Sequence, residues 1–522
     1  MHWIDVVADE LMKRGKEHVI ASGTSISGQP HVGSAEDPIL ADAIARVVRE
    51  RGGTAQAIWI RDDLDQLRKV PAQIPPEFEK YLGTPVAHMP CPEGDHCKSF
   101  VDHFAGPFIE SLKRAGVDVA VYSGAQMYSS GMYDEVTRQA IASAKKVTQI
   151  FEEVSGAEKG EGWIPFQVVC SNCGKIGTTK VLGFENDKFT YECSGGTVDR
   201  KQIPGCGHRG DAGIRSGKLQ WRVEWAARWK VLGITCEPFG KDHAAAGGSY
   251  DTCKRIITEV FGYPPPHPVV YEWVVFSGKR LKKSAGHVIT FDEFMNCVTP
   301  EVARFFFFRT KAWKHRDFDL SKNILMLIED YERSERIYFG KEEYSLDKEL
   351  PDIRRSYELA QVSKVPTECF QVPYSHLISI VQTARDWSGL LSILGRTENL
   401  GKISPEQEAK LREKADAVRY WLENYAPDEY KFAVLLEKPA VELDQAQMDF
   451  LHGISSSLGS IKWDASEIHT HIYDSAKNAG IEPKKVFEAI YLAILGQKRG
   501  PRVGYFLATL DREFVLKRFG EA

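Results

Sequence analysis

The chain has 522 residues, and at about 150 residues per domain this length predicts roughly three or four domains. Apolar residues make up 43% and charged residues 27%, which excludes a disordered polymer, a collagen-like fibre and a disulfide-stapled miniprotein. The net charge of -5 excludes a globally basic nucleic-acid binder, but it leaves room for local basic surfaces that bind phosphates.

Hydropathy and cysteine content point to an intracellular enzyme or binding protein. The mean hydropathy is -0.31 and no apolar run reaches about 18 residues, so we expect no membrane-spanning helix. The first residues lack the basic and apolar stretches of a secretory signal. We therefore expect a cytoplasmic protein whose 10 cysteines are thiols or metal ligands rather than disulfides.

The N-terminal residues alternate between strand and helix signals. Residues 18–23 form a short apolar run that predicts a buried strand, and a turn rich in Gly and Ser follows it. An amphipathic helix is expected over residues 35–50, with glycines at its end, and further strands over 55–60 and 116–122. This strand–helix–strand order predicts a parallel sheet.

The pattern changes twice further along the chain. Residues 161–215 are rich in Gly, Cys and Lys and lack helical periodicity, which predicts a small inserted module. Mixed signals then return, with a strand expected over 269–276 and a basic loop after it. Beyond about residue 300 the periodicity is helical. Within that part, Ser404–Gln407 predicts a helix start, with Ser as N-cap, Pro at the first position and Gln at the third.

Three motifs carry residues suited to phosphate chemistry. Gly28–Ser34 lies in the first strand-to-helix turn, where His31 and the helix N-terminus can bind phosphate. Phe239–Asp251 combines small residues with an acid and a histidine at a predicted strand end. Ser277–Gly286 is a cationic loop that can stabilise charge in a transition state. Taken alone, the first motif favours an ordinary turn and the third favours a solvated basic loop, whereas the second is equally compatible with a glycine-rich loop.

In this order the three motifs resemble the signatures of class I aminoacyl-tRNA synthetases. Pro30–Ser34 is similar to their HIGH signature, and Arg280–Ser284 is similar to their KMSKS signature. The resemblance is strongest to the class I lysyl-tRNA synthetases and covers nearly the whole chain. Ile26 and Ala226 depart from it, since proline is usual at both positions. The stretches that carry this closer resemblance are Ser22–Gly23 with Gly28–Gly33, Asp62–Asp65 with Arg68–Pro71, Trp221–Trp229, Gly240–Asp251, and Gly500–Arg502 with Gly504.

The resemblance implies a reaction and assigns roles to residues. Lysine attacks the α-phosphate of ATP, which Mg2+ accompanies, and the lysyl-adenylate then passes its aminoacyl group to tRNA(Lys). The implied catalytic residues are His31, Ser34, Lys282, Lys283 and Ser284. The implied ATP-binding residues are Gly28, Gly33, Gly240, Asp242, His243, Arg280 and Lys283. The implied lysine-binding residues are Gly23, Ser25, Asp37, Glu224, Trp225 and His243, with Asp37 or Glu224 near the ammonium.

The resemblance also implies the fold and the partners. We expect an α/β Rossmann-type nucleotide-binding catalytic domain with a zinc-binding insertion, followed by an all-α C-terminal region that binds the anticodon arm. The expected partners are L-lysine, ATP and tRNA(Lys), the expected cofactors are Mg2+ and Zn2+, and we expect a monomer. The expected domains are 1–160 and 216–295 for the two catalytic halves, 161–215 for the insertion, 296–350 for a connecting helical region, and 351–522 for the anticodon-binding part.

A cysteine constellation predicts a structural zinc site. Cys170 and Cys173 are separated by two residues, and Cys193 and Cys206 follow at spacings typical of a zinc knuckle. His208 is an alternative to Cys206. Because four protein ligands leave no open coordination position, the predicted role of this metal is structural.

A second cluster lies earlier in the chain. It could hold a second metal ion, or it could be a loop with incidental polar residues and buried thiols. The candidate ligands are Cys91, His96, Cys97 and His103.

Other functions remain open at this level. A class I synthetase for another amino acid, such as glutamate, would need cations in its pocket, and Arg222 and Arg228 could supply them. An RNA-binding protein that kept the scaffold without catalysis is disfavoured by His31, Asp242 and Lys283. A small nucleotidyltransferase would not need a C-terminal helical region of this size.

Overall fold

The structure is a computed structural model that describes residues 1–276, 279–280, 289–398 and 400–522. The described chain divides into two compact units. Residues 1–295, 303–318 and 344–365 form the first unit, and residues 296–302, 319–343 and 366–522 form the second. The predicted site residues Lys282, Lys283 and Ser284 lie outside the described residues, and Arg280 is described by its backbone only.

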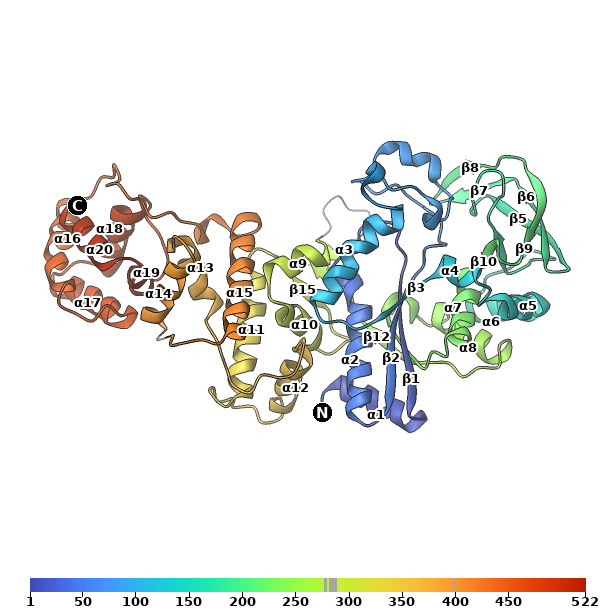
Figure 1. The fold of residues 1–522 in the computed structure, drawn as a ribbon, viewed down its shortest axis with the longest axis horizontal. Helices are drawn as coiled ribbons and strands as arrows, with labels where there is room; N and C mark the ends of the chain where they lie inside the picture. Colours follow the sequence, from blue (N-terminus) through green and yellow to red (C-terminus); the bar gives the residue numbers. More distant parts are fainter. Residues whose placement is uncertain (277–278, 281–288, 399) are drawn as a thin grey trace. The chain divides into compact units, whose positions relative to one another are not determined.

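The centre of the first unit is a parallel sheet with the strand order β12-β11-β1-β2-β3 (Figure 1). Its apolar strands are largely buried, as expected for a parallel sheet covered on both faces. The strands expected over 18–23 and 55–60 are confirmed as β1 and β2, whereas the strand expected over 116–122 is the shorter β3, which begins only at Ala120. The sheet consists of β1 (Glu17–Thr24), β2 (Thr54–Arg61), β3 (Ala120–Ser123), β11 (Cys236–Gly240) and β12 (His267–Tyr271).

The helix expected over 35–50 is α2 (Glu36–Glu50). It packs on β1 and β2 and buries Ile39, Ile44 and Val47 against them, and α1 (Trp3–Arg14) packs on α2. The chain then turns through Gly52, whose φ of 80° is a conformation that glycine adopts without strain. The first βαβ unit therefore forms as the sequence predicts.

The insertion has no helix among its described residues and consists of antiparallel strands. β10 pairs with β4, β7 with β8, and β6 lies between β5 and β9. The strands are β4 (Phe166–Val168), β5 (Thr179–Glu185), β6 (Lys188–Cys193), β7 (Gly195–Val198), β8 (Lys201–Pro204), β9 (Arg209–Gly213) and β10 (Gly217–Leu219).

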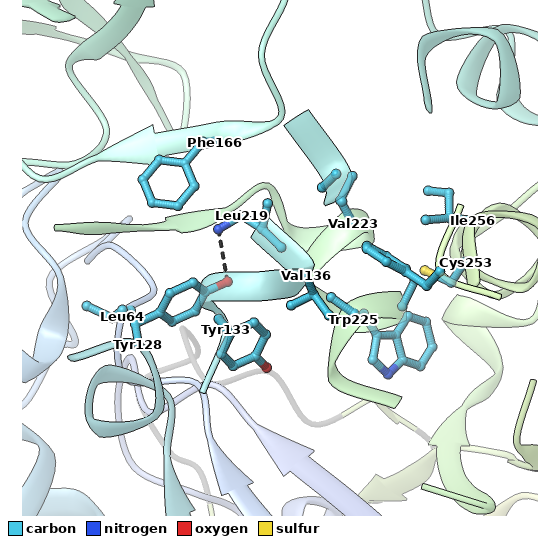
Figure 2. Close-up of a cluster of buried hydrophobic side chains, with 14 of the residues drawn as sticks. Leu64, Tyr128, Tyr133, Val136, Phe166, Leu219, Val223, Trp225, Cys253 and Ile256 are labelled. Carbon is cyan, nitrogen blue, oxygen red and sulfur yellow. Dashed lines mark hydrogen bonds between the residues drawn. The ribbon is translucent and has the colours of Figure 1, made fainter. Parts of the chain in front are cut away.

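The insertion shares one hydrophobic core with the central sheet. Phe166 of the insertion packs in the same cluster as Ile60 of β2 and Trp225. Figure 2 shows this cluster, in which the backbone N–H of Leu219 donates to the Tyr128 hydroxyl at 2.9 Å. Burial of large aromatic side chains on both sides of this boundary fixes the insertion against the sheet.

The remaining helices of the first unit surround the sheet and insertion. Trp221, Trp225 and Trp229 all lie on α7, so the expected helical spacing of these tryptophans is confirmed. These helices are α3 (Phe100–Arg114), α4 (Gly124–Ser129), α5 (Asp134–Ala142), α6 (Ala144–Ser155), α7 (Trp221–Val231), α8 (Ser249–Glu259) and α12 (Leu350–Ala360); α9 (Phe291–Cys297) and α10 (Pro300–Phe308) each cross between the units.

The single strand expected over 269–276 is two strands in the structure. β12 ends at Tyr271 in the central sheet, and β13 (Val274–Phe276) pairs instead with β14 (Lys279–Arg280) and β15 (Arg316–Phe318). The interruption arises because the backbone N–H of Glu272 donates to Ala312 rather than to a strand of the central sheet. A continuous apolar run does not reveal where a chain changes sheets.

The described part of the second unit is helical, as expected. Ser404 caps α15, and its side chain and that of Gln407 form the reciprocal hydrogen bonds of a capping box. Residues 374–397 form two helices, because the side chain of Asp386 caps the second one. The helices are α11 (Asn323–Tyr338), α13 (Tyr374–Thr383), α14 (Trp387–Thr397), α15 (Pro405–Asn424), α16 (Gln445–Leu458), α17 (Ala465–Asn478), α18 (Pro483–Leu495), α19 (Val503–Thr509) and α20 (Arg512–Gly520).

Among the described residues, none of the helices has both the length and the apolar character needed to cross a membrane. Trp421 of α15 is fully buried, and its indole N–H donates to the Leu320 carbonyl at 2.7 Å. Trp421 is therefore part of the core of the second unit.

Candidate active site

The first motif forms a tight turn at the start of α2. Val32–Ala35 is a short 3-10 helix that leads directly into α2. A Cβ atom at Gly33 would lie 3.0 Å from the His31 imidazole, so glycine lets the ring lie against the backbone there. The N–H of Val32 donates to Ile289, at 3.1 Å, which places the turn beside the segment that follows the basic loop.

A cavity of about 490 Å³ opens at the carboxyl ends of β1, β2, β11 and β12. This edge of a parallel sheet is where ligands bind in open α/β folds. The expected residues Gly23, Ser25, Asp37, Trp225, Gly240 and His243 all line it. The cavity is also lined by residues that were not among the implied site residues, namely Ser27, Asp62, Asp65, Gln66, Arg68, Trp221, Arg228, Glu237, Pro238, Phe239 and Tyr271.

Several expected site residues do not line this cavity. Glu224 is buried on α7, and one of its carboxylate oxygens lies 2.6 Å from the ammonium of Lys218. Asp242 accepts from the indole N–H of Trp273 at 3.3 Å. None of the described residues of the first motif, Gly28–Ser34, lines the cavity, so the expected Gly28, His31, Gly33 and Ser34 lie outside its wall.

One wall of the cavity is aromatic. Trp225 lies at the centre of this wall, with ring centroids 5.4 Å from both Trp221 and Phe239 and 5.5 Å from His243. Burial lowers the pKa of His243, so this imidazole is neutral near pH 7. The wall therefore offers flat apolar surface to an aliphatic chain.

A buried charge network includes three residues that line the cavity, Asp62, Asp65 and Arg228. The Lys218 ammonium lies 2.7 Å from Asp65 and 2.6 Å from Glu224, and Arg228 forms a close ion pair with Asp62. Although burial lowers the pKa of Lys218, the surrounding carboxylates hold it well above its usual value. Because Lys218 belongs to β10, this strand contributes the ion-pair partner of Asp65, a residue that lines the cavity.

Glu237 lies on β11 and differs from the other acids of the cavity. Its Oε2 accepts from the indole N–H of Trp225 at 2.9 Å and also from that of Trp229. Burial raises the pKa of Glu237 to about 7, although both indole bonds and nearby Arg228 oppose this rise. The signal that could have revealed it is a single acid within an otherwise apolar strand.

The four-cysteine cluster of the insertion assembles as its spacing predicts. The sulfurs of Cys170 and Cys206 lie 3.6 Å apart, those of Cys173 and Cys193 lie 3.7 Å apart, and all four are within 4.8 Å of one another. The alternative ligand His208 instead places its Nε2 3.1 Å from the hydroxyl of Ser171. The donor set therefore fits a tetrahedral thiolate site.

The second cluster differs from the expectation that the cysteines are thiols or metal ligands. Cys91 and Cys97 are joined by a disulfide. The same two sulfurs and a ring nitrogen of His103 lie within 4.8 Å of one another, which also fits three ligands when the cysteines are reduced. His96 is outside this group of described residues.

Comparison with known proteins agrees with this architecture. Residues 1–363 match the family of tRNA synthetases class I (K), and residues 390–522 match an anticodon binding domain. A lysine–tRNA ligase of Archaeoglobus fulgidus is 41% identical over 100% of both chains. One of Methanosphaera stadtmanae is 39% identical over 99% of each, and one of Methanocaldococcus jannaschii is 36% identical over 99% of each.

These matches identify an aminoacyl-tRNA synthetase scaffold: a nucleotide-binding sheet followed by a helical anticodon-binding region. The chain belongs to the class I lysyl-tRNA synthetase family.

Proposed function

We propose that this protein is a lysine–tRNA ligase that activates L-lysine with ATP in the cavity and transfers it to tRNA(Lys). The observation that carries the proposal is the charge of the cavity. Among the described residues that line it, four are acids and two are arginines. One of those arginines, Arg228, is already neutralised by its ion pair with Asp62. Such a site favours an amino acid with a cationic side chain.

The alternative substrate, glutamate, is disfavoured by the same geometry. Its side-chain carboxylate would need a cation that is not already paired. Arg222 does not line the cavity; its guanidinium packs 5.9 Å from the Phe151 ring centroid and donates to Thr252 at 3.5 Å. Arg68 is exposed at the rim of the cavity.

The proposed mechanism depends on positioning and charge neutralisation. The lysine carboxylate would attack the α-phosphate of ATP, releasing pyrophosphate, while Mg2+ bound with ATP would neutralise part of the phosphate charge. His31 and the N–H groups at the start of α2 would bind phosphate oxygens. Gly240 would let the adenosine lie against the end of β11. By family resemblance, Lys282 and Lys283 would stabilise charge that develops at the α-phosphate.

Zinc at Cys170, Cys173, Cys193 and Cys206 is part of this proposal. It would hold the turns after β4 and β8 against the end of β6. We also propose that, when reduced, Cys91 and Cys97 can bind a second metal with His103. Monomeric state and cytoplasmic location stay predictions.

Metal analysis of the purified protein is expected to find at least one tightly bound zinc per chain. Cys173→Ser should lose this zinc and destabilise the insertion, because structural zinc contributes directly to folding free energy. The control is Cys297→Ser, which removes a buried thiol outside both clusters and should keep the metal. A metal-free wild type with full activity and stability would contradict the assignment.

Amino-acid-dependent exchange of pyrophosphate into ATP, measured with and without tRNA, tests the proposed function. Lysine should support exchange and glutamate should not. Comparing the two conditions also determines whether activation depends on bound tRNA. Exchange supported by glutamate, with none from lysine in either condition, would reject the proposal.

A further inference from the structure

We propose that Glu237 binds the side-chain ammonium of the substrate and thereby selects lysine. This inference rests on the proposed function, and it names which acid of the cavity makes the selecting contact. The sequence pointed instead to Asp37 or Glu224.

The position of Glu237 suits the far end of a long side chain. It lies three residues before Gly240, where β11 ends, which is about 10 Å along the strand. Phe239 is two residues along the same strand and so faces the same side of the sheet, and both residues line the cavity. Trp225 contacts the Phe239 ring and donates to the Glu237 carboxylate. The four-carbon stem of lysine could therefore cover apolar rings and end at a carboxylate.

The hydrogen bonds of Glu237 leave one oxygen for a ligand. Among the described residues, the groups that donate to this carboxylate are the indoles of Trp225 and Trp229, and both donate to Oε2. Neither indole carries a charge, so the carboxylate has neutral donors and no directly bound cation. An ammonium at Oε1 would supply the missing charge without displacing either indole.

The other acids in or near the cavity either have a cationic partner or lie at a position less suited to binding the lysine ammonium. Asp62 is paired with Arg228, and Asp65 with Lys218. Glu224 lies outside the cavity wall. Asp37 accepts from the Tyr271 hydroxyl in the first turn of α2, beside the motif that would bind phosphate. Glu237 differs from Asp62 and Asp65 in that the indoles bound to it are uncharged, and it differs from Asp37 in lying on β11 rather than beside that motif.

Burial gives this contact a pH dependence that can be measured. With a pKa of about 7, Glu237 is largely protonated below neutral pH in the free protein. A lysine ammonium favours the ionised carboxylate, so binding releases a proton at pH 6 but almost none at pH 8. Lysine should then bind about tenfold more weakly at pH 6 than at pH 8. The charged groups Arg228 and Asp62 and the neutral imidazole of His243 also surround this site, and they are the same in every variant compared below.

The test is exchange kinetics of wild type, Glu237→Gln and Glu237→Asp, with norleucine as a competing inhibitor. Glutamine keeps an acceptor for both indoles and removes the charge. It should raise KM for lysine by roughly 10²-fold or more, as for loss of one partner of a buried charged hydrogen bond. KM for ATP and inhibition by norleucine, which lacks the ammonium, should stay within about threefold. Glu237→Gln should also abolish the pH dependence of KM for lysine. Glu237→Asp should give an intermediate KM.

Glu272→Gln is the matched control. Glu272 follows the cavity residue Tyr271 but binds Lys241 at 2.6 Å and His315 at 3.2 Å, so its substitution removes a nearby charge without altering the cavity. Its lysine KM should equal that of wild type. A wild type that does not activate lysine would reject the proposed function itself. If the wild type activates lysine, and Glu237→Gln and Glu237→Asp both keep its KM for lysine and its preference for lysine over norleucine, the role of Glu237 is overturned.

Discussion

Lys283→Ala should slow formation of the lysyl-adenylate by about 10²–10³-fold, the usual effect of removing one contact to transition-state charge. By family resemblance Lys283 occupies the second lysine of the KMSKS-like signature. Charge on the α-phosphate grows as the lysine carboxylate attacks, so an ammonium there stabilises the transition state more than bound ATP. Single-turnover measurement of adenylate formation should therefore show a slower chemical step, with little change in the Kd of ATP.

The control for Lys283→Ala is Lys13→Ala, which removes an exposed lysine that is paired with Glu10 on α1 and lies outside all three motifs. It should leave adenylate formation unchanged. A rise in KM for ATP with an unchanged rate of adenylate formation would contradict the transition-state role and make Lys283 a ground-state contact.

Lys218→Met should lower the free energy of unfolding by about 3–5 kcal/mol, which is the usual cost of removing one partner of a buried ion pair. The substitution leaves the carboxylates of Asp65 and Glu224 buried without their shared cation. Because Asp65 lines the cavity, KM for lysine should rise as well. Urea denaturation of the whole chain measures the first effect, and exchange kinetics measure the second.

Lys201→Met is the control on the same insertion. Its ion pair with Glu79 is exposed, and surface pairs contribute about 0–1 kcal/mol. Adding Glu224→Gln to Lys218→Met should restore part of the lost stability, since one unpaired carboxylate then becomes neutral. A loss below about 1 kcal/mol for Lys218→Met would contradict the view that this network supports the cavity wall.

Local patterns predicted the elements that build the frame of the site. The apolar runs of β1 and β2 and the amphipathic period of α2 are local properties, and each element formed near its expected residues. The cysteine spacing was equally informative, because ligands brought close by short turns need little help from the rest of the fold.

Long-range pairing could not be predicted in the same way. Glu237 faces the cavity because β11 is seated between β1 and β12, and its indole donors come from a helix that precedes it. Glu224, which is flanked by tryptophans in the sequence, is instead buried in an ion pair with Lys218. The disulfide between Cys91 and Cys97 likewise depends on how one loop folds. Each case turns on which side chains meet, and periodicity does not carry that information.

The measurement that tests the central claim most directly is aminoacylation of total tRNA with radiolabelled lysine, glutamate and arginine in parallel. A cavity with excess acid and a paired Arg228 predicts no charging with glutamate, and the lysyl-tRNA synthetase family predicts charging with lysine rather than arginine. The charged tRNA should carry a lysine anticodon when it is isolated and sequenced. Charging with glutamate or arginine but not with lysine would contradict the account.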